Sequence, residues 1–387
     1  MELELNEEQR QFRDLIRQFT NREVRPVARE MEQSGTYPTR IVELMAEMGL
    51  FGLTVPNEFG GLGADTITLA LVFEELSRGW MGIAGMIGSH GMACKLIAQH
   101  GTEAQRDLYL RELASGRRRS GLALTEPDAG SDLQGIKTVA RLQGDHYVVS
   151  GTKTWITNAR HSDPLPVLVK TDPDASPAHS GMSILLVAAD TPGLLVTRDL
   201  GKLGYKGPET CEVVLDDAVV PAENLLGGIE GKGMSQAISG LQTGRVNIAA
   251  RGVGVAHRAL EEALSYTQER EAFGRPVADF QAVQMRLADM ATKVQAARSL
   301  TWWAADRLDR GADAATESAM AKLFASEVAL EASMESMRLH GGYGYSTEFE
   351  VERLYRDAPM MVIGEGTNDI LRTVITKGLR NNGIPES

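Results

Sequence analysis

An acidic side chain stands between two glycines near the C-terminal end of the sequence, in the run Gly364-Glu365-Gly366. Apolar residues precede this run, and the two glycines leave the backbone bare enough for a ligand to approach closely. A carboxylate that is removed from water becomes a stronger base. The run therefore suits a catalytic base, although a solvated turn is the commoner use of these residue types.

Two further segments combine residue types that could bind a ligand. The stretch from Leu124 to Asp132 places hydroxyls, acids, a proline and a glycine in one turn, and alone it could be a surface turn. The stretch from His340 to Tyr345 is rich in glycine and follows a predicted long helix. It could end that helix, or its backbone amides could approach a phosphate.

Composition and the absence of other motifs narrow the possible functions. The 387 residues carry a net charge of -12, which disfavours nucleic acid as a partner. No zinc-binding spacing surrounds the two cysteines, and no P-loop, GxGxxG fingerprint or nucleophile elbow occurs. We expect no metal. The N-terminus lacks the pattern of a signal peptide, and no apolar run is long enough to span a membrane, so we expect a cytoplasmic protein.

The elements that would position these residues fall into three stretches. Helical signals begin at a cap at Asn6, with Phe12, Leu15, Ile16 and Phe19 on one face, and continue to about residue 115. Glycine-rich stretches at 60–63 and 82–91 are predicted to separate helices. Short β-rich runs then follow, at residues 147–149, 155–157, 167–169, 184–187 and 212–215.

Helical periodicity returns after Gly231, and Gly252 and Gly254 within it are predicted to serve close helix packing. The order of helices, strands and helices, without alternating βαβ units, argues against a doubly wound sheet. We therefore predict an α+β multidomain protein. Its predicted parts are an N-terminal α-helical domain at 1–120, a central β domain at 121–228 and a C-terminal α-helical domain at 229–387.

In order and spacing, these segments together resemble the acyl-CoA dehydrogenase family over nearly the whole chain. Leu124 to Asp132 reproduces the Thr-Glu-Pro-x-Ala-Gly-Ser-Asp run of that family, and the stretch from Gly341 to Asp357 reproduces a second pattern. One position departs, because Arg338 stands where the family usually has a glutamine that contacts the adenosine end of the flavin. The resemblance implies N-terminal helices, a central β-barrel-like domain and a C-terminal four-helix bundle.

The resemblance also implies a reaction, in which acyl-CoA thioesters are oxidised to trans-2-enoyl-CoA with bound FAD. Glu365 would remove the α-proton, and the β-hydrogen would leave as hydride to the flavin. The backbone amide of Glu365 and a ribityl hydroxyl of the flavin would bind the thioester carbonyl. Some relatives carry the base just before the arginine that corresponds to Arg245. Gly244 occupies that position here and cannot act as a base, which favours Glu365.

By resemblance, the remaining site residues divide between cofactor and substrate. Several contacts at the adenosine end of the cofactor would come from a neighbouring subunit. The FAD contacts would be Leu122, Leu124, Thr125, Ser131, Trp155, Thr157, Arg270, Phe273, Gln281, Arg338, Gly341, Gly342, Thr367 and Asp369. The substrate contacts would be Ser131, Arg245, Gly364 and Gly366.

Two of these residues have plain structural alternatives, since Trp155 could be sheet core and Arg270 could form a surface ion pair. Many relatives have a bulky aromatic residue where this chain has Gly364, which predicts a roomier acyl pocket for branched or cyclic groups. Another side chain could instead fill that gap.

The resemblance implies a homotetramer in fatty acid metabolism that passes electrons from the acyl-CoA substrate to an electron-transfer flavoprotein. Three other activities use the same chemistry: oxidation of an acyl group on a carrier protein, an enoyl-CoA reductase and an acyl-CoA oxidase. A non-catalytic flavin or acyl-CoA binding scaffold is the alternative from a different class, and an intact Glu365 speaks against it.

Overall fold

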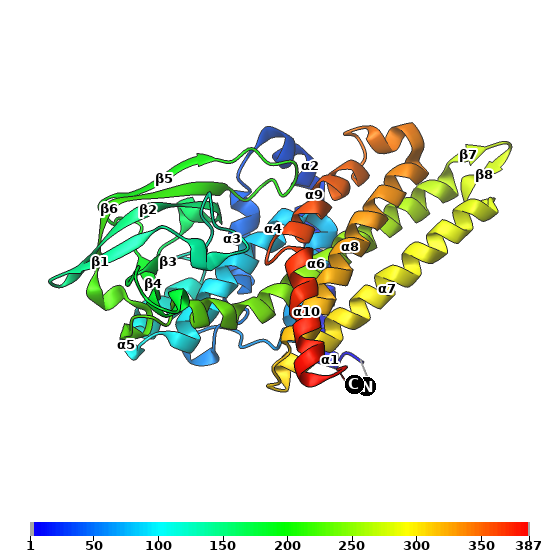
Figure 1. Cartoon of the computed structure of the whole chain (residues 1–387). Coiled ribbons are helices and arrows are strands. Elements are labelled where there is room, and N and C mark those ends of the chain that lie inside the picture. Colours follow the sequence, from blue (N-terminus) through cyan, green and yellow to red (C-terminus); the bar gives the residue numbers. More distant parts are fainter. Residues whose placement is uncertain (1–3, 386–387) are drawn as a thin grey trace.

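The computed structural model describes residues 4–385, in which helices come first and last along the chain and the strands of a sheet come between them in sequence. In Figure 1 the sheet lies at the left and the long C-terminal helices extend to the right. The first helical part comprises α1 (Glu7–Phe19), α2 (Arg25–Ser34), α3 (Thr39–Glu47), α4 (Thr66–His100) and α5 (Glu103–Ala114). The capping box predicted at Asn6 is present, since its side chain accepts from the backbone of Gln9. Of the residues predicted to share one face of α1, Ile16 and Phe19 are buried, whereas Leu15 is half exposed.

The predicted helix break at 82–91 is wrong, because these residues lie inside α4, whose only non-helical residue is Trp80. The glycines of this stretch do not reverse the chain, and they allow other residues to pack closely against α4. A Cβ on Gly85 would lie 2.0 Å from the hydroxyl of Tyr205, and one on Gly88 would lie 2.3 Å from the amide nitrogen of Asn247. Glycine therefore lets α4 approach its neighbours closely. The break predicted at 60–63 is correct, as this stretch is a turn before α4.

The central part is one six-stranded sheet in the order β4-β3-β1-β2-β6-β5, in which only the β1–β3 pair is parallel. The runs predicted at 147–149 and 155–157 belong to one long strand, and two strands, β1 and β5, were not predicted. The strands are β1 (Val139–Gln143), β2 (His146–Thr157), β3 (Leu165–Lys170), β4 (Met182–Val187), β5 (Leu194–Asp199) and β6 (Thr210–Pro221).

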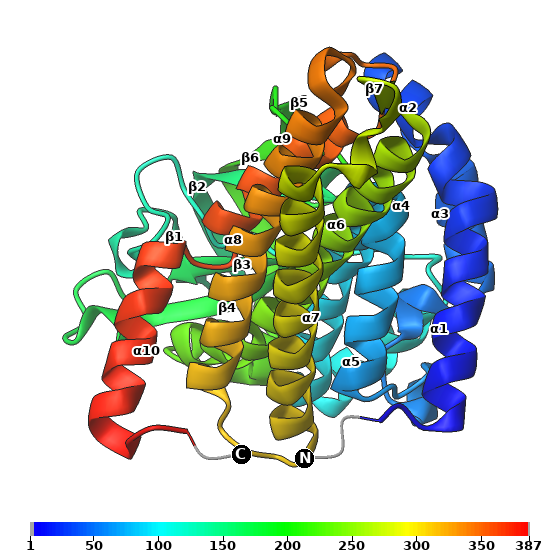
Figure 2. The same cartoon turned by 90° about the vertical axis from the view of Figure 1, so that its right-hand side faces the viewer.

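The C-terminal part is built around long helices that lie side by side in two views (Figures 1 and 2). They are α6 (Gly233–Glu269), α7 (Gln281–Asp309) and α8 (Ala315–His340), followed by α9 (Val351–Ile363) and α10 (Asn368–Asn382). A short hairpin of β7 (Glu271–Ala272) and β8 (Arg275–Pro276) joins α6 to α7.

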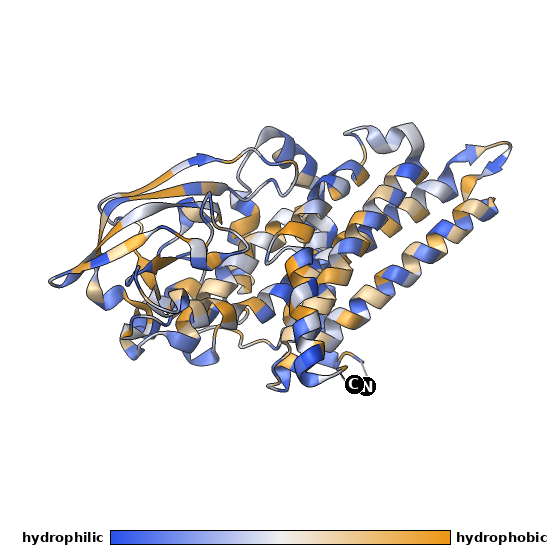
Figure 3. Ribbon diagram, viewed as in Figure 1, coloured by the Kyte–Doolittle hydropathy of each residue, from blue (hydrophilic) through white to orange (hydrophobic). Residues whose placement is uncertain are grey.

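Close helix packing at Gly252 and Gly254 is confirmed. A Cβ on Gly252 would lie 2.8 Å from the carbonyl of Ala325 on α8, and one on Gly254 would lie 2.3 Å from that of Glu74 on α4. Hydrophobic colours recur along α4, α6 and α8, whereas the β7–β8 strands are hydrophilic (Figure 3). The helical core thus extends across both helical parts. Within residues 4–385, none of the helices has the length and apolar character that crossing a bilayer requires.

Candidate active site

Glu365 lies in the tight connection between α9 and α10. The α9 helix ends at Ile363, and Thr367 caps α10 by accepting a hydrogen bond from the backbone of Ile370 at 3.3 Å. Glu365 itself has a φ of 56°, a left-handed conformation that costs a non-glycine residue on the order of 1–2 kcal/mol. Such strain persists only where the surroundings enforce it, and it is common at functional sites.

Lys322 on α8 stabilises this connection through hydrogen bonds. Its ammonium group donates to the carbonyl of Gly366 at 2.8 Å and to Oδ1 of Asn368 at 2.9 Å, and it lies 3.4 Å from the carbonyl of Val362. The Lys322 side chain is completely buried. Burial lowers its pKa to about 8, although nearby Glu365 acts in the opposite direction. A buried cation therefore joins the end of α9 to the start of α10 and fixes the turn between them.

The Glu365 carboxylate faces α6 at Gly244, a position without a side chain. A Cβ built on Gly244 would lie 3.0 Å from Oε2 of Glu365 and 3.3 Å from Sδ of Met92. Gly244 occupies the position at which some members of the resembled family carry their base. The Glu365 carboxylate faces this same residue. A larger side chain at Gly244 would push the carboxylate away.

Opposing effects set the basicity of Glu365. Burial raises the pKa of this carboxyl above its ordinary value of 4.5, and the cations Arg251, Arg245 and Lys322 act against that rise, with burial prevailing. The site thus contains a carboxylate of raised basicity surrounded by three cations. A general base is most effective when its pKa is near the working pH.

Two of the three cations near Glu365 are themselves buried and incompletely bonded. Arg245 is 8% exposed and Arg251 is 4% exposed, and the Nε of each lacks a hydrogen-bond partner within the described part of the chain. The Arg251 guanidinium lies 5.0 Å from the ring centre of Tyr205. Buried donors without partners are rare, so their presence beside a carboxylate suits a site that awaits a ligand.

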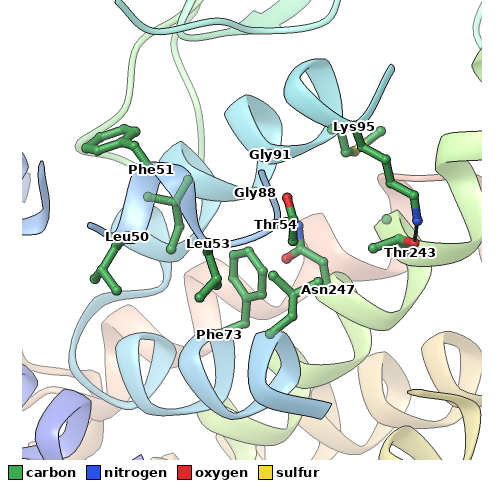
Figure 4. Close-up of a pocket in the computed structure, with 14 residues that line it drawn as sticks. Leu50, Phe51, Leu53, Thr54, Phe73, Gly88, Gly91, Lys95, Thr243 and Asn247 are labelled. Atoms are coloured by element: carbon green, nitrogen blue, oxygen red, sulfur yellow. Dashed lines mark hydrogen bonds between the residues drawn. The ribbon is translucent and has the colours of Figure 1, made fainter. Parts of the chain in front are cut away.

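A mostly apolar cavity lies next to Gly244 (Figure 4). Gly244, which the carboxylate faces, and Met92, which also lies close to Gly244, belong to its wall. The other lining residues come from α4, α6 and the segment before α4: Leu50, Phe51, Leu53, Thr54, Leu69, Phe73, Ile87, Gly88, Gly91, Lys95, Thr243 and Asn247. The geometry therefore places a base close to Gly244 in the wall of a mostly apolar cavity, whose polarity suits an aliphatic group.

The predicted flavin-contact residue Trp155 is not sheet core. Its side chain is 57% exposed, and its backbone has a φ of 61° at an irregularity in the β2–β6 pairing. The neighbouring Lys153 is fully buried and donates to Glu126 at 2.8 Å and to the carbonyl of Leu124 at 3.2 Å. This arrangement anchors the Leu124–Asp132 segment to β2 and leaves an aromatic face free to cover a flat ligand.

The structure brings several other predicted flavin contacts together beside Trp155. The carbonyl of Thr125 accepts from the backbone of Thr154 at 2.9 Å, and a Cβ on Gly121 would lie 2.3 Å from the carbonyl of Thr157. The segment that carries Leu122, Leu124 and Thr125 therefore runs beside the end of β2. Ser131 lies farther along it and is exposed.

A second group of predicted residues gathers far from this sheet, where α6 and α8 end and α7 begins. Arg270, Arg338, Gly341 and Gly342 line one open depression. A Cβ on either glycine would meet nothing within 4 Å, so the backbone there is accessible. The surface ion pair considered for Arg270 does not occur within residues 4–385, whereas Arg338 pairs with Glu335. Bare backbone and an unpaired guanidinium fit the pyrophosphate of a dinucleotide.

Phe273 projects from the tip of the β7–β8 hairpin and is 96% exposed, with a φ of 53°. Gln281 begins α7 and is also exposed. Within the chain they lack the enclosure that a cofactor site provides, which suits residues that reach a neighbouring subunit.

Three predicted contacts have additional or different surroundings from those expected. The Thr367 hydroxyl caps α10, and exposed Asp369 lies 3.4 Å from Arg372. The space at Gly364 is partly filled, since a Cβ there would lie 3.2 Å from Sδ of Met360. Met360 has a flexible, unbranched side chain that can move within this space.

Sequence reasoning missed Lys322 and Arg251. A lysine in a helix is ordinarily assigned to the surface, yet Lys322 falls on a face of α8 otherwise formed by small buried residues such as Ser318, Ala325 and Ala329. A lysine within a face of small residues was therefore the feature of the sequence from which the burial of Lys322 could have been predicted. Arg251 similarly interrupts a run of buried residues on α6.

Comparison with known proteins gives a consistent result along the chain. Family models match three stretches: the acyl-CoA dehydrogenase N-terminal domain at 6–117, the middle domain at 121–218 and the C-terminal domain at 231–380. A probable acyl-CoA dehydrogenase of Bacillus subtilis is 42% identical over 98% of this chain and 100% of its own length. A caffeyl-CoA reductase-Etf complex subunit of Acetobacterium woodii is 38% identical over 96% and 98%.

A solved structure gives the same relationship. Butyryl-CoA dehydrogenase from Megasphaera elsdenii superposes with a TM-score of 0.95 and 34% identity, covering 98% of this chain and 100% of that one.

Proposed function

Because the chain belongs to the acyl-CoA dehydrogenase family of oxidoreductases, we propose that it converts an acyl-CoA thioester to the trans-2-enoyl-CoA, with Glu365 as the base. One observation carries this proposal: the Glu365 carboxylate, raised in pKa, faces Gly244 at the edge of an apolar cavity. An acyl chain in that cavity would bring its α-carbon to the carboxylate.

The residues would share the work of removing a weakly acidic proton. Glu365 would take the α-proton, and its backbone amide would donate to the thioester oxygen and stabilise the enolate charge. Arg245, Arg251 and Lys322 would limit the electrostatic cost of that charge in a buried site. The exposed face of Trp155 and the bare glycines at 341 and 342 fit FAD. When bound, FAD supplies the acceptor for the β-hydride.

The predicted preference for wide acyl groups remains part of this proposal. Gly364 leaves out an aromatic side chain, but Met360 partly occupies the space. Because an unbranched thioether can move aside, branched or cyclic groups would be accommodated by displacing Met360. The pocket would then adapt to the width of the acyl group.

The proposed partners are a second copy of this chain and an electron-transfer flavoprotein. The exposed Phe273 and the open depression near Arg270 support an assembly that completes the adenosine end of the FAD site between subunits, and the family resemblance favours a tetramer. An electron-transfer flavoprotein is supported by the similarity to a subunit of a reductase-Etf complex.

That same similarity supports the opposite direction as a second candidate, because the relative is named a reductase. A protonated Glu365 could deliver a proton to the α-carbon of an enoyl thioester with the same geometry. Which direction predominates would depend on the electron donor or acceptor.

A spectroscopic experiment tests the proposed function. The purified protein should be yellow with bound FAD, and acyl-CoAs added anaerobically should bleach the flavin. Transfer of those electrons to an electron-transfer flavoprotein should restore the colour. A protein without flavin, or a flavin that no saturated acyl-CoA bleaches and no enoyl-CoA reoxidises after chemical reduction, would contradict it.

A further inference from the structure

The cavity beside Glu365 is apolar along most of its wall but not throughout. Leu50, Phe51, Leu53 and Phe73 form one side of it (Figure 4). Apolar side chains alone would suit a plain hydrocarbon tail. Polar groups in such a wall have a desolvation cost and need a reason to be present.

Asn247 is the first such group. It lies on α6, is 5% exposed, and its Oδ1 has no hydrogen-bond partner within residues 4–385. Its amide points into the cavity opposite Thr54 (Figure 4). Gly88 makes room for it, because a Cβ there would lie 2.3 Å from Nδ2 of Asn247. The packing therefore accommodates an amide whose hydrogen-bonding capacity the protein leaves unused.

Lys95 is the second polar group. It lies on α4, lines the same cavity and donates a hydrogen bond to the hydroxyl of Thr243 (Figure 4). No carboxylate lies within ion-pairing distance of Lys95 in the part of the chain that the structure describes. Burial lowers its pKa, and only the more distant Asp309 opposes that effect. A half-buried cation whose partner is a neutral hydroxyl and not a carboxylate favours an anion or a further oxygen acceptor.

We propose that the acyl group accepted by this cavity carries an oxygen substituent beyond its β-carbon, which forms a hydrogen bond with the Asn247 amide: a hydroxyl donates to the unpartnered Oδ1, and a carbonyl or carboxylate oxygen accepts from Nδ2. When the oxygen belongs to a carboxylate, Lys95 adds electrostatic attraction. This inference rests on the proposed function and specifies its substrate class. The two polar groups act on selectivity, whereas the proton is removed elsewhere, at Glu365.

An acyl-CoA panel of constant chain length tests the inference. The flavin-loaded enzyme is mixed anaerobically with hexanoyl-CoA, 6-hydroxyhexanoyl-CoA, 5-oxohexanoyl-CoA or adipyl-CoA, and bleaching gives kcat/KM for each. At least one oxygenated chain should exceed hexanoyl-CoA by about tenfold, since leaving a buried polar group unpaired disfavours the plain chain. Preference for adipyl-CoA would indicate a carboxylate, and preference for the others a neutral oxygen.

Variants assign the preference to residues. Asn247→Leu keeps the size of the side chain but removes its polarity, and it should abolish the preference, so that kcat/KM for the oxygenated chains no longer exceeds that for hexanoyl-CoA. Lys95→Met should lower the ratio of kcat/KM for adipyl-CoA to that for hexanoyl-CoA, and Lys377→Met, an exposed lysine on α10, is the matched control.

The wild-type panel decides the matter even if a variant fails to fold. Hexanoyl-CoA that matches or exceeds all three oxygenated chains overturns this inference and leaves the proposed function intact. An Asn247→Leu enzyme that keeps the full preference also overturns it. Failure of every acyl-CoA to bleach the flavin would instead remove the proposed function, and this inference with it.

Discussion

The Glu365 turn and the β7–β8 hairpin both carry predicted site residues in left-handed backbone conformations, yet their surroundings differ completely. Glu365 is enclosed by α6, α8 and the ends of α9 and α10, with a buried lysine bonded to its turn. Phe273 at the hairpin tip is 96% exposed. The first region is enclosed by elements of this chain, whereas the described part of the chain leaves Phe273 uncovered.

The two regions would therefore have different functions in the proposed enzyme: proton removal at the Glu365 turn, and flavin retention and assembly at the hairpin. Changes at the Glu365 turn should affect the rate of proton removal and leave flavin binding and assembly unchanged. Changes at the hairpin should affect flavin retention and assembly and leave the chemistry of a fully loaded enzyme unchanged. The predictions below test that separation.

Glu365→Gln should have the largest effect. The amide keeps the shape of the side chain but cannot accept the proton, so flavin bleaching by an acyl-CoA should slow by about 10³-fold, within the range for general bases. Stopped-flow absorbance measures the rate. Glu103→Gln, an exposed acid on α5, is the control and should react normally.

Lys322→Met should slow bleaching by about tenfold or more, because the carbonyl of Gly366 and the side chain of Asn368 lose a charged donor. Loss of the cation should also raise the pKa of Glu365 further. The acid limb of kcat/KM against pH should therefore move to higher pH, a shift that a merely structural defect would not cause. Lys322→Gln, which keeps a donor without the charge, should show the same shift with a smaller loss of rate.

The lowered pKa of Lys322 also predicts how stability depends on pH. Between about 8 and the ordinary 10.5, the unfolded chain holds a proton that the folded chain releases. The free energy of unfolding should therefore gain a contribution that rises with pH across that window. Chemical denaturation of the wild type and Lys322→Met at several pH values measures it, and equal slopes for both proteins would refute it.

Phe273→Ala should weaken flavin retention by about tenfold and shift the assembly toward smaller species, as for the loss of an aromatic anchor at an interface. Folding of the chain itself should be unaffected, because this side chain is almost fully exposed. Flavin content after dilution and light scattering measure the two effects. Leu142→Ala, an exposed residue on β1, should change neither. Slow flavin bleaching by Phe273→Ala even in saturating FAD would contradict the proposal that the hairpin affects flavin retention and assembly but not the chemistry.

Gly364→Ala should have the smallest effect. Its Cβ would press on Sδ of Met360, which is flexible, so straight-chain substrates should react within about twofold of the wild-type rate. Branched acyl-CoAs should lose several-fold more in kcat/KM. Equal losses for straight and branched chains would remove Gly364 as a determinant of acyl width.

The sequence predicted the larger organisation because periodicity reports burial. The capped start of α1, the helical periodicity of α7 and the close packing at Gly252 all follow from local patterns. The glycines of α4 were misinterpreted because their function depends on Tyr205 and Asn247, which approach from distant parts of the chain. Local sequence cannot distinguish a glycine that breaks a helix from a glycine that allows a distant residue to pack closely against the helix.

At the site, sequence motifs predicted which residues take part but not which other residues surround them. Glu365 and Trp155 were identified from sequence, whereas their left-handed backbones are enforced by tertiary packing. Lys322 was missed because a helical lysine is usually exposed. The spacing of Asn247 and Lys95 on different helices gave no indication that both line one cavity.

The most direct test of the central claim follows the α-proton itself. An acyl-CoA with sulfur at the β-position has no β-hydride to give, so only α-proton removal is possible. In deuterium oxide, the wild-type flavin-loaded enzyme should exchange its α-protons, measured by mass spectrometry, and Glu365→Gln should exchange them about 10³-fold more slowly while retaining its flavin. Exchange by Glu365→Gln at the wild-type rate would contradict the assignment of Glu365 as the base.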